Sequence, residues 1–572
     1  MVTQRTKKLR LFAALAAFAL VLAACGSSSK SSSGGGSSNT AAAGKKGGAL
    51  VVGAEQWPDC LNPITQCANS SWLQWLIPIH VLPRLAELDP NNNFVASPLI
   101  TELPTTSNGG VTGSGKTFTV TYHLNPNAKW DDGTAITSAD VVFSWQAVMK
   151  STGSVTTAGY DKITTIGTPN PQTAVVHFST TYNDWPDVLG GFSGVILEKS
   201  KFPQGPDTGK TMQTSIGFSG GPWKLESFSK DKEVLVRNAS YWDASRIPLL
   251  DSVTFVPVTE TTKEVQAIKT GQVAAIYPQP AVDNVPELTG ASNLKTIFGS
   301  TTQYENIWYN EKQGHPFADK NVRAAFSYAF DRQTFLNDIV KPFDPSVQML
   351  NCAVWLPAVG KWCVEPYPWS DVSPDAQKVN QYMTASGYTK NGSGYWSKGG
   401  QTLTIKWMAN TGNKRREDTQ AEFIPLLAKQ GFKVVTDNSD SGTVFQKRLP
   451  AGDYDMSMFI QVASPDPTVT SSMSCAQIPS AANQGQGQND WWYCDKAADA
   501  LMTQSDAELN VDQRQQEIHQ LDQVMRQDYV NLPLYAFPSM LAWDPSQVTG
   551  PVTQYINNPE SNLWNLYAWS KP

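Results

Sequence analysis

Alternating apolar and polar residues predict short strands in the first half of the chain. Residues 118–124 place Phe, Val, Tyr and Leu in turn with Thr and His, which is the period of two of a half-buried strand. Residues 49–52 form a short apolar run, and residues 219–243 read as two strands joined by a polar turn. Thr137 and Asp140 have the spacing of a capping box, so we expect a helix to begin there.

The second half of the chain alternates helical and extended patterns. Helical periodicity covers residues 319–340, 374–388, 415–430 and 512–528. The strand-like runs are residues 401–410, 432–437 and 532–537. A strand–helix–strand order such as that of residues 401–437 is typical of two parallel strands joined by a helix. The pattern therefore predicts a mixed α/β protein.

The N-terminus has the pattern of an export signal. Four basic residues and no acid occur in residues 1–10, and the apolar run Leu11–Leu22 has only twelve residues, too few for a membrane span of about 20. Residues 22–25, "LAAC", resemble the lipobox of bacterial lipoproteins, which implies cleavage before Cys25 and lipidation of its thiol. Residues 26–48 are rich in Gly and Ser. We expect residues 1–24 to be a signal peptide and residues 25–47 a lipidated tether.

Residues 110–117, "GVTGSGKT", match the phosphate-loop pattern G-x-x-x-x-G-K-[ST]. A phosphate loop follows a buried strand and opens a helix, whose first N–H groups hold the anion. Here no buried strand is predicted upstream, and a strand follows the loop where a helix is required. The segment therefore predicts a Gly-rich turn between strands and no nucleotide site.

Charge and motifs exclude several classes of function. The whole chain has a net charge of −6, and removal of residues 1–24 makes the body more acidic, which gives no footprint for nucleic acid. There is no G-x-S-x-G and no H-E-x-x-H motif. Paired acids such as Asp131 with Asp132, or Asp453 with Asp455, are more simply turn residues than a glycosidase pair. We expect no enzyme and no cofactor, and a length that gives two or more domains.

Six cysteines beyond Cys25 fall into three local pairs. These are Cys60 with Cys67, Cys352 with Cys363, and Cys475 with Cys494. Six cysteines allow 15 connectivities, so neighbour pairing is an inference. A metal site is the alternative, but no spacing is C-x-x-C and the chain has only five histidines. We expect three disulfides and no metal site.

Several segments carry a family resemblance. They are residues 122–145, 220–243, 315–332, and 452–459 followed by 464–467. In this order they resemble the markers of family 5 of the bacterial extracellular solute-binding proteins, the dipeptide-, oligopeptide- and nickel-binding components of ABC importers. The resemblance covers about residues 48–572. A cysteine pair after the last marker is also found in dipeptide binders, which supports Cys475–Cys494.

The resemblance implies an α/β, two-lobed, type II periplasmic-binding-protein fold with a ligand cleft between the lobes. Lobe I would comprise residues 48–300 and 535–572, and lobe II residues 301–534. The hinge would lie near residues 300–310 and 531–537. The implied partners are a small solute or peptide, permease subunits with cytoplasmic ATPase subunits, and the membrane through the lipid anchor. A monomer is expected, on the outer face of the cytoplasmic membrane or in the periplasm.

The ligand residues are where the chain departs from the family. Peptide-binding members have an acid four residues before Pro467 that pairs with the peptide ammonium, and here that residue is Ala463. Asp466 is the nearest substitute, although in the family its position more often shapes the turn. Arg415 and Arg416 either meet a peptide carboxylate or are solvated charges of a first helical turn.

Tryptophans are a second set of candidate ligand residues. Trp355 and Trp407 lie in the expected second lobe, as do Trp491 and Trp492. Their faces can stack on sugars or side chains, or simply pack in the core. The few histidines argue against nickel. We therefore expect peptides as ligands, with an oligosaccharide or another non-peptide solute as the alternative, and a non-transporting sensor as a further one.

Overall fold

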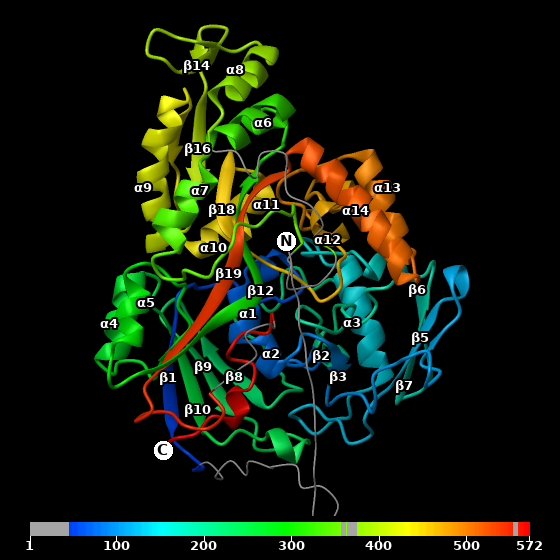
Figure 1. Ribbon diagram of the computed structural model, residues 1–572. Coiled ribbons are helices and arrows are strands. Elements are labelled where there is room, and N and C mark those ends of the chain that lie inside the picture. The colour runs from blue at the N-terminus through cyan, green and yellow to red at the C-terminus, as the bar shows by residue number, and fades with distance from the viewer. Residues whose placement is uncertain (1–44, 356–361, 363–373, 553–558) are drawn as a thin grey trace, which may run out of the picture. The chain divides into compact units, whose positions relative to one another are not determined.

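A ten-stranded mixed sheet organises the part of the chain that carries the site (Figure 1). The computed structural model describes residues 45–355, 362, 374–552 and 559–572. The strand order in the sheet is β17-β16-β18-β12-β19-β11-β1-β10-β9-β8. Their bounds are β1 (Ala49–Ala54), β8 (Trp223–Phe228), β9 (Glu233–Arg237), β10 (Ser252–Pro257), β11 (Ala275–Ile276), β12 (Lys295–Tyr309), β16 (Thr404–Met408), β17 (Lys433–Thr436), β18 (Met456–Val462) and β19 (Asn531–Trp543).

Two long antiparallel strands, β12 and β19, join the two halves of this sheet. Their register runs from Lys295 opposite Trp543 to Trp308 opposite Asn531. At one end β19 pairs with β11, which leads to the N-terminal strand group (β11, β1, β10, β9, β8). Near the other end β12 pairs with β18, which leads to the C-terminal strand group (β18, β16, β17). The crossovers expected near residues 300–310 and 531–537 lie within these two strands.

β19 is longer than its sequence pattern predicts because two prolines interrupt the pattern. Pro533 lies opposite Asn306 and Pro538 lies opposite Ser300. The register of the pair shifts at both places, between Glu305 and Asn306 and again after Ser300. A proline has no N–H to give to a ladder, so within sheets it is confined to edges and irregular positions. The two shifts allow one strand to continue through both prolines.

Helices cover the faces of the sheet and of the smaller sheets (Figure 1). The helices are α1 (Ser71–Leu76), α2 (Pro78–Val81), α3 (Ser138–Lys150), α4 (Thr261–Lys269), α5 (Asn284–Thr289), α6 (Lys320–Ala329), α7 (Arg332–Phe335), α8 (Ala376–Ala385), α9 (Lys414–Lys429), α10 (Ser441–Thr443), α11 (Leu449–Ala451), α12 (Thr470–Met473), α13 (Lys496–Ala507) and α14 (Val511–Asp528). The smaller sheets are β2 (Ala86–Leu88) with β3 (Phe94–Ala96); β4 (Val111–Thr112), β5 (Thr119–His123), β7 (Thr173–Phe178) and β6 (Ile163–Asn170); and β13 (Thr389–Lys390), β14 (Trp396–Lys398) and β15 (Gln401–Thr402).

Most local predictions hold. Thr137 and Asp140 form the capping box of α3. The parallel pair β16 and β17 is joined by α9, as the strand–helix–strand order predicts. The helical pattern of residues 319–340 is interrupted: α6 ends at Ala329, and Asp331 accepts a hydrogen bond from the N–H of Thr334 and so begins α7. A second start signal inside one periodic segment explains this difference.

The segment that matches the phosphate-loop pattern is a turn between strands. It leads from β4 into β5, and the two strands pair antiparallel. Gly113 has a φ of 72°, and a Cβ there would lie 2.1 Å from the backbone oxygen of Thr117. Lys116 is exposed. The glycines serve the turn, and the strand that follows confirms the interpretation.

Two large hydrophobic cores lie in the described part of the chain. One core includes Trp223 and Trp569 with the residues around the N-terminal strand group. The other includes Trp308 and Trp407 with the residues around the C-terminal strand group. The second core also contains Ile268 of α4, Ile276 of β11 and Leu288 of α5, so it continues beside the N-terminal strand group.

Candidate ligand-binding site

A cavity of about 1780 Å³, counting space open to solvent, lies beside the middle of the large sheet. We call it the main pocket. The N-terminal part of the chain contributes Glu55 after β1 and Trp72 and Trp75 of α1 to its wall. The C-terminal part contributes all residues from Phe459 to Val469, together with Trp491. The pocket therefore has walls from both sides of the β12–β19 pair.

One edge of β18 faces the main pocket without a strand partner among the described residues. β16 pairs with β18 only at Met456 and Ser457, whereas β12 pairs along its whole length. The N–H of Ala463, which follows β18, donates to the carbonyl of Thr302 in β12. Because alternate residues of a strand bond to opposite sides, the backbone groups of Ile460 and Val462 point away from β12. Both residues line the pocket, so this edge can accept an extended chain.

A buried ion cluster lies where α9 meets the pocket. Glu305 of β12 is fully buried and pairs with both Arg415 and Arg416, with an Nε–Oε1 distance of 2.9 Å to Arg416. Arg416 lines the pocket, whereas Arg415 does not. Both arginines are buried, so the alternative of solvated first-turn charges is wrong. Glu55 lies beside this cluster and accepts two hydrogen bonds from Gln279, and burial raises the pKa of Glu55.

Asp466 lines the main pocket, but its carboxylate already has a cationic partner. Arg514 of α14 donates through both terminal nitrogens, at 2.8 Å to Oδ2 and 2.5 Å to Oδ1. Oδ1 also accepts a hydrogen bond from the N–H of Thr468, so Asp466 shapes the turn, the role that its position more often has in the family. Ala463 lines the pocket as well. Peptide-binding members of the family have an acid at the position of Ala463. Because Asp466 already pairs with Arg514, it is not a simple replacement for that acid.

Besides Glu55, three acids of the pocket wall were missed by sequence reasoning. They are Asp184 and Asp187, in the loop after β7, and Asp490. Burial raises the pKa of Asp184 well above its usual value, that of Asp187 to about 7, and that of Asp490 to about 8. The segments around them have no motif or periodic pattern that marks these acids as functional. Only their burial beside the pocket marks these three acids as candidate ligand-binding residues.

The tryptophan predictions have different outcomes. Trp355 lines the pocket and its ring N–H donates to the carbonyl of Pro467 at 2.8 Å. Trp407 does not line it: this residue is fully buried in the core, edge-on to Phe330. The prediction of Trp407 as a ligand residue is therefore corrected, because alternation along β16 turns its side chain to the core. Trp491 lines the pocket and stacks on Trp308 at a centroid distance of 3.9 Å.

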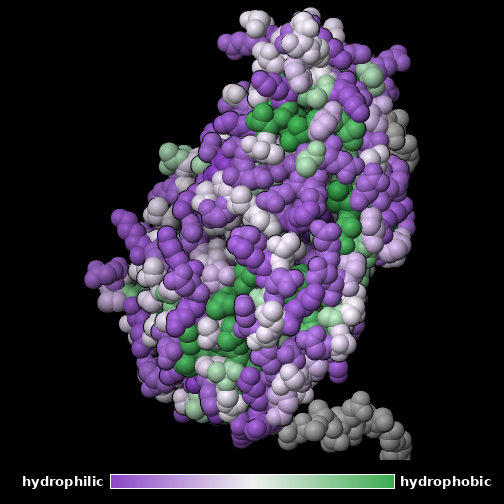
Figure 2. Space-filling model, turned by 90° about the vertical axis from the view of Figure 1, so that its left-hand side faces the viewer, coloured by the Kyte–Doolittle hydropathy of each residue, from purple (hydrophilic) through white to green (hydrophobic). Residues whose placement is uncertain are grey.

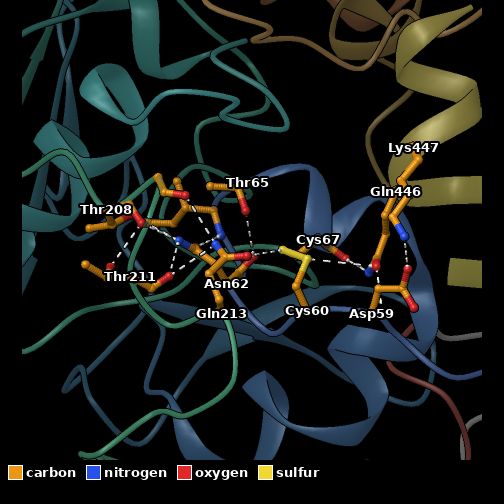
Figure 3. The surroundings of a disulfide bond; sticks show 12 residues. Asp59, Cys60, Asn62, Thr65, Cys67, Thr208, Thr211, Gln213, Gln446 and Lys447 are labelled. Atoms are coloured by element: carbon orange, nitrogen blue, oxygen red, sulfur yellow. Dashed lines mark hydrogen bonds and ion pairs between the residues drawn. A yellow bond between two sulfur atoms is a disulfide. The ribbon is translucent and has the colours of Figure 1, made fainter. Parts of the chain in front are cut away.

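A disulfide loop connects the two sides near the pocket (Figure 3). Cys60 and Cys67 form a disulfide, and Gln446 lies against the loop between them. The N–H of Asp59 donates to Oε1 of Gln446 at 2.8 Å, and Nε2 of Gln446 donates to the carbonyl of Cys67 at 2.7 Å. Lys447 pairs with Asp59 at 2.6 Å.

A second disulfide joins Cys475 and Cys494. Two of the three expected neighbour pairs are therefore present in the structure. Cys363 lies outside the described residues, so its pairing with Cys352 stays a prediction. Cys25 also lies outside them, and so do the expected signal peptide and residues 26–44 of the expected tether.

The described residues form neither a candidate metal site nor a helix that could cross a membrane. Among the described residues, no three His, Cys, Asp or Glu side chains are grouped as metal ligands. No described helix has the length and apolar character needed to cross a bilayer. On the face shown in Figure 2, hydrophobic side chains form separate patches among hydrophilic ones. The main pocket is thus the feature of the described chain that fits a ligand best.

Comparison with known proteins assigns this arrangement to a family. The oligopeptide-binding protein AppA of Bacillus subtilis strain 168 is 24% identical over 470 residues, which cover 78% of this chain and 79% of AppA. The solved structure of AppA in complex with a nonapeptide has a TM-score of 0.79 at 21% identity, covering 92% of this chain and all of that one. A periplasmic EDTA-binding protein, EppA, has a TM-score of 0.76 at 18% identity, covering 93% and 97%.

The fold is that of the type II periplasmic binding proteins, as the resemblance predicts. Residues 102–479 match the family described as bacterial extracellular solute-binding proteins, family 5 Middle, and this range is more than half of the chain. The mixed α/β sheet and the pocket beside β12 and β19 agree with that match. The chain belongs to family 5 of the bacterial extracellular solute-binding proteins.

Proposed function

We propose that this protein is the substrate-binding component of an ABC importer and that its ligands are peptides. AppA and its complex with a nonapeptide support this choice of ligand. The observation that carries the proposal is the unpaired edge of β18 on the wall of the main pocket. An extended peptide can add to such an edge as a further strand, with its main chain bonded to Ile460 and Val462.

The charges of the pocket wall also suit a peptide. A peptide has an anionic and a cationic end, and the wall includes Arg416 as well as the carboxyl groups of Asp184 and Asp187. Aromatic rings of Trp72, Trp75 and Tyr277 pack edge-to-face beside the pocket. They offer apolar surface for side chains without fixing one sequence. Backbone bonding with adaptable side-chain space favours a range of peptides.

Two lobes and a hinge give a mechanism for capture. We assign residues 48–300 and 535–572 to lobe I and residues 301–534 to lobe II, with β12 and β19 as the connection. A ligand that touches both lobes stabilises the form in which they meet, because only that form makes both sets of contacts. The hydrogen bonds of Gln446 to the disulfide loop join the two lobes in the same form. The permease subunits would recognise this closed form, and their ATPase partners would supply the energy.

Anchoring at the membrane follows from the N-terminal sequence. We propose that residues 1–24 are removed, that Cys25 is lipidated, and that residues 25–47 tether the binding domain to the outer face of the cytoplasmic membrane. Two acyl chains hold a protein stably where one does not. Intact-mass measurement of protein extracted from membranes should show a chain that begins at a lipidated Cys25. A mature chain with another start and no lipid would rule this out.

A non-peptide ligand is the second candidate. EppA has the same fold and is described as EDTA-binding, so the fold does not select peptides by itself. Trp72, Trp75, Trp355 and Trp491 line the main pocket, and aromatic faces of this kind stack on sugar rings as readily as on side chains. An oligosaccharide importer, or a sensor that binds without transport, would use the same pocket.

Calorimetry with purified protein separates these candidates. Mixed di- to pentapeptides should bind, and cello- and malto-oligosaccharides should not. The matched variant is Val462→Pro, which removes an N–H that points to the pocket while leaving the bonds to β12. It should weaken peptide binding by about tenfold, the worth of one or two hydrogen bonds. Binding of sugars alone, or peptide binding unchanged in Val462→Pro, would contradict the proposal.

A further inference from the structure

Asp184 is a buried acid on the wall of the main pocket with an unused hydrogen-bonding atom. Its side chain is 5% exposed, and Oδ1 accepts no hydrogen bond from any described residue. Buried polar atoms in folded proteins nearly always have partners, because a bare one loses its bonds to water without compensation. Asp184 lies in the loop after β7, on the side of the N-terminal strand group. An unpartnered carboxyl oxygen at a pocket wall is what a ligand donor would satisfy.

The groups around Asp184 are mostly acidic. Facing it are Asp187 from the same loop, Asp466 and Asp506 with Arg514 from the C-terminal part, and the phenols of Tyr160 and Tyr182. Asp506 accepts hydrogen bonds from the hydroxyls of Thr468 and Thr470.

Arg514 is the cation in this group, and its terminal nitrogens are both used by Asp466. Arg514 thus faces the carboxyl groups of Asp184, Asp466 and Asp506, while Arg84, which also pairs with Glu560, is the cation near Asp187. The carboxyl groups outnumber these two guanidiniums, so a further positive charge would improve the balance, and the open side of the cluster is the pocket.

We propose that Asp184, supported by Asp187, receives the cationic group of the ligand, either the α-ammonium of a peptide or a basic side chain. This rests on the proposed function and adds the residue that selects for charge. It also accounts for Ala463: the acid is absent from the C-terminal part of the pocket and is supplied by the loop after β7 instead. The ligand cation then lies between the two lobes and draws Asp184 toward Asp466 on the opposite side.

Asp490 is the competing acid. It also lines the pocket, and its Oδ1 has no partner among the described residues. Its Oδ2, however, accepts the side-chain amide of Asn69 at 2.6 Å, and its raised pKa has burial as its cause with no acidic neighbour. A single neutral carboxyl group of this kind can remain protonated. The Asp184 cluster contains more acids than guanidiniums, so its acids cannot all lose their protons without a further cation, and we assign the ligand cation to it.

Three peptide mixtures test the assignment by native mass spectrometry and calorimetry. The first contains short peptides with a free N-terminus and no Lys or Arg. The second contains the same peptides N-acetylated, and the third the N-acetylated peptides with one Lys. The wild type should bind the first or the third mixture about tenfold or more tightly than the second, and the mixture that binds identifies the source of the cation. Asp184→Asn should lose this preference.

The controls separate a charge role from a structural one. Asp231→Asn changes an exposed acid in the turn between β8 and β9 and should keep the preference. Calorimetry in two buffers of different ionisation enthalpy should show that wild-type protein releases protons at pH 7 when it binds the cationic mixture. Asp184→Asn should release fewer, while its thermal unfolding stays cooperative.

The possible outcomes distinguish between Asp184, Asp490 and a failure of the proposed function. If peptides bind and Asp184→Asn keeps both the preference and the proton release, the assignment is wrong while the proposed function stands. If Asp490→Asn loses the preference and Asp184→Asn does not, Asp490 is the receptor. If none of the three mixtures binds to the wild type, the proposed function fails and this assignment fails with it.

Discussion

Gln446, in the π-helical segment Val444–Arg448, donates a hydrogen bond of 2.7 Å to the backbone carbonyl of Cys67 in the N-terminal disulfide loop. The same side chain accepts the N–H of Asp59. Replacing it by alanine removes two hydrogen bonds that join the lobes, worth about 1–3 kcal/mol together. Gln446→Ala should therefore weaken ligand binding by about five- to a hundredfold, with most of the change in the dissociation rate.

Stopped-flow fluorescence checks this prediction. Gln333→Ala is the matched control, because Gln333 is exposed and bonds within its own helical segment to Asn337. An unchanged dissociation rate in Gln446→Ala would show that the disulfide loop does not hold the lobes together.

Affinity for a cationic peptide should increase with pH between about 5 and 7. Burial raises the pKa of Asp187 to about 7, so below this pH Asp187 carries a proton in the empty pocket, and burial raises the pKa of Asp184 as well. A cation binds the ionised form better, and fewer protons must leave as the pH rises. Calorimetric titration of a Lys-containing peptide over this range should show the trend, and an N-acetylated neutral peptide should not. A flat profile for both would contradict it.

Because of its buried Glu233, the folded protein should become less stable as the pH rises. Its side chain is fully buried in β9, neither oxygen has a partner among the described residues, and burial raises its pKa well above the usual value. The folded state thus holds a proton that the unfolded state releases above pH 4 to 5, so stability is full below that pH and declines above it. Each pKa unit is worth about 1.4 kcal/mol.

Glu233→Gln removes this charge, so its melting temperature relative to wild type should increase from pH 5 to pH 8 by several degrees. Glu226→Gln, at an exposed position of the neighbouring strand β8, is the control and should show no such trend. Equal melting temperatures for Glu233→Gln and wild type at every pH would argue that the carboxyl group has a partner.

The Cys475–Cys494 disulfide should contribute about 3 kcal/mol to stability in the chain-entropy model, given its separation of 19 residues. Replacing both cysteines by serine should lower the midpoint of chemical unfolding accordingly. Non-reducing peptide mapping should find this pair, Cys60–Cys67 and Cys352–Cys363. Free thiols at all of these positions in exported protein would overturn the assignment.

Lys116→Ala should leave both ligand binding and thermal stability unchanged. Lys116 is an exposed residue of a turn between β4 and β5, with no helix after it to hold a phosphate. ATP should produce no thermal shift in the wild type. A saturable shift that disappears in Lys116→Ala would reinstate the nucleotide site.

Local chemistry explains which features the sequence could predict. The capping box at Thr137 and the strand–helix–strand order of β16, α9 and β17 depend on neighbouring residues, so they are visible in the chain itself. The length of β19 was underestimated because Pro533 and Pro538 are tolerated only through register shifts in β12, which lies far away in sequence.

The site was harder to predict than the fold. Arg416 and Trp355 were named and do line the pocket, but Trp407 lies in the core. Asp184 was missed altogether, since an aspartate in a short loop has no pattern of its own. Its environment arises only when the loop packs against Asp466 and Arg514, more than 250 residues away.

The stacked rings of Trp308 and Trp491 give the protein a built-in optical probe. Two indoles this close and nearly parallel couple their electronic transitions, which produces a paired circular dichroism band that neither ring gives alone. Trp491 lines the main pocket while Trp308 is anchored in β12, so a solute that presses on one ring changes the angle between them. Occupancy could then be followed without any label, and the same signal would report unknown ligands retained from the host.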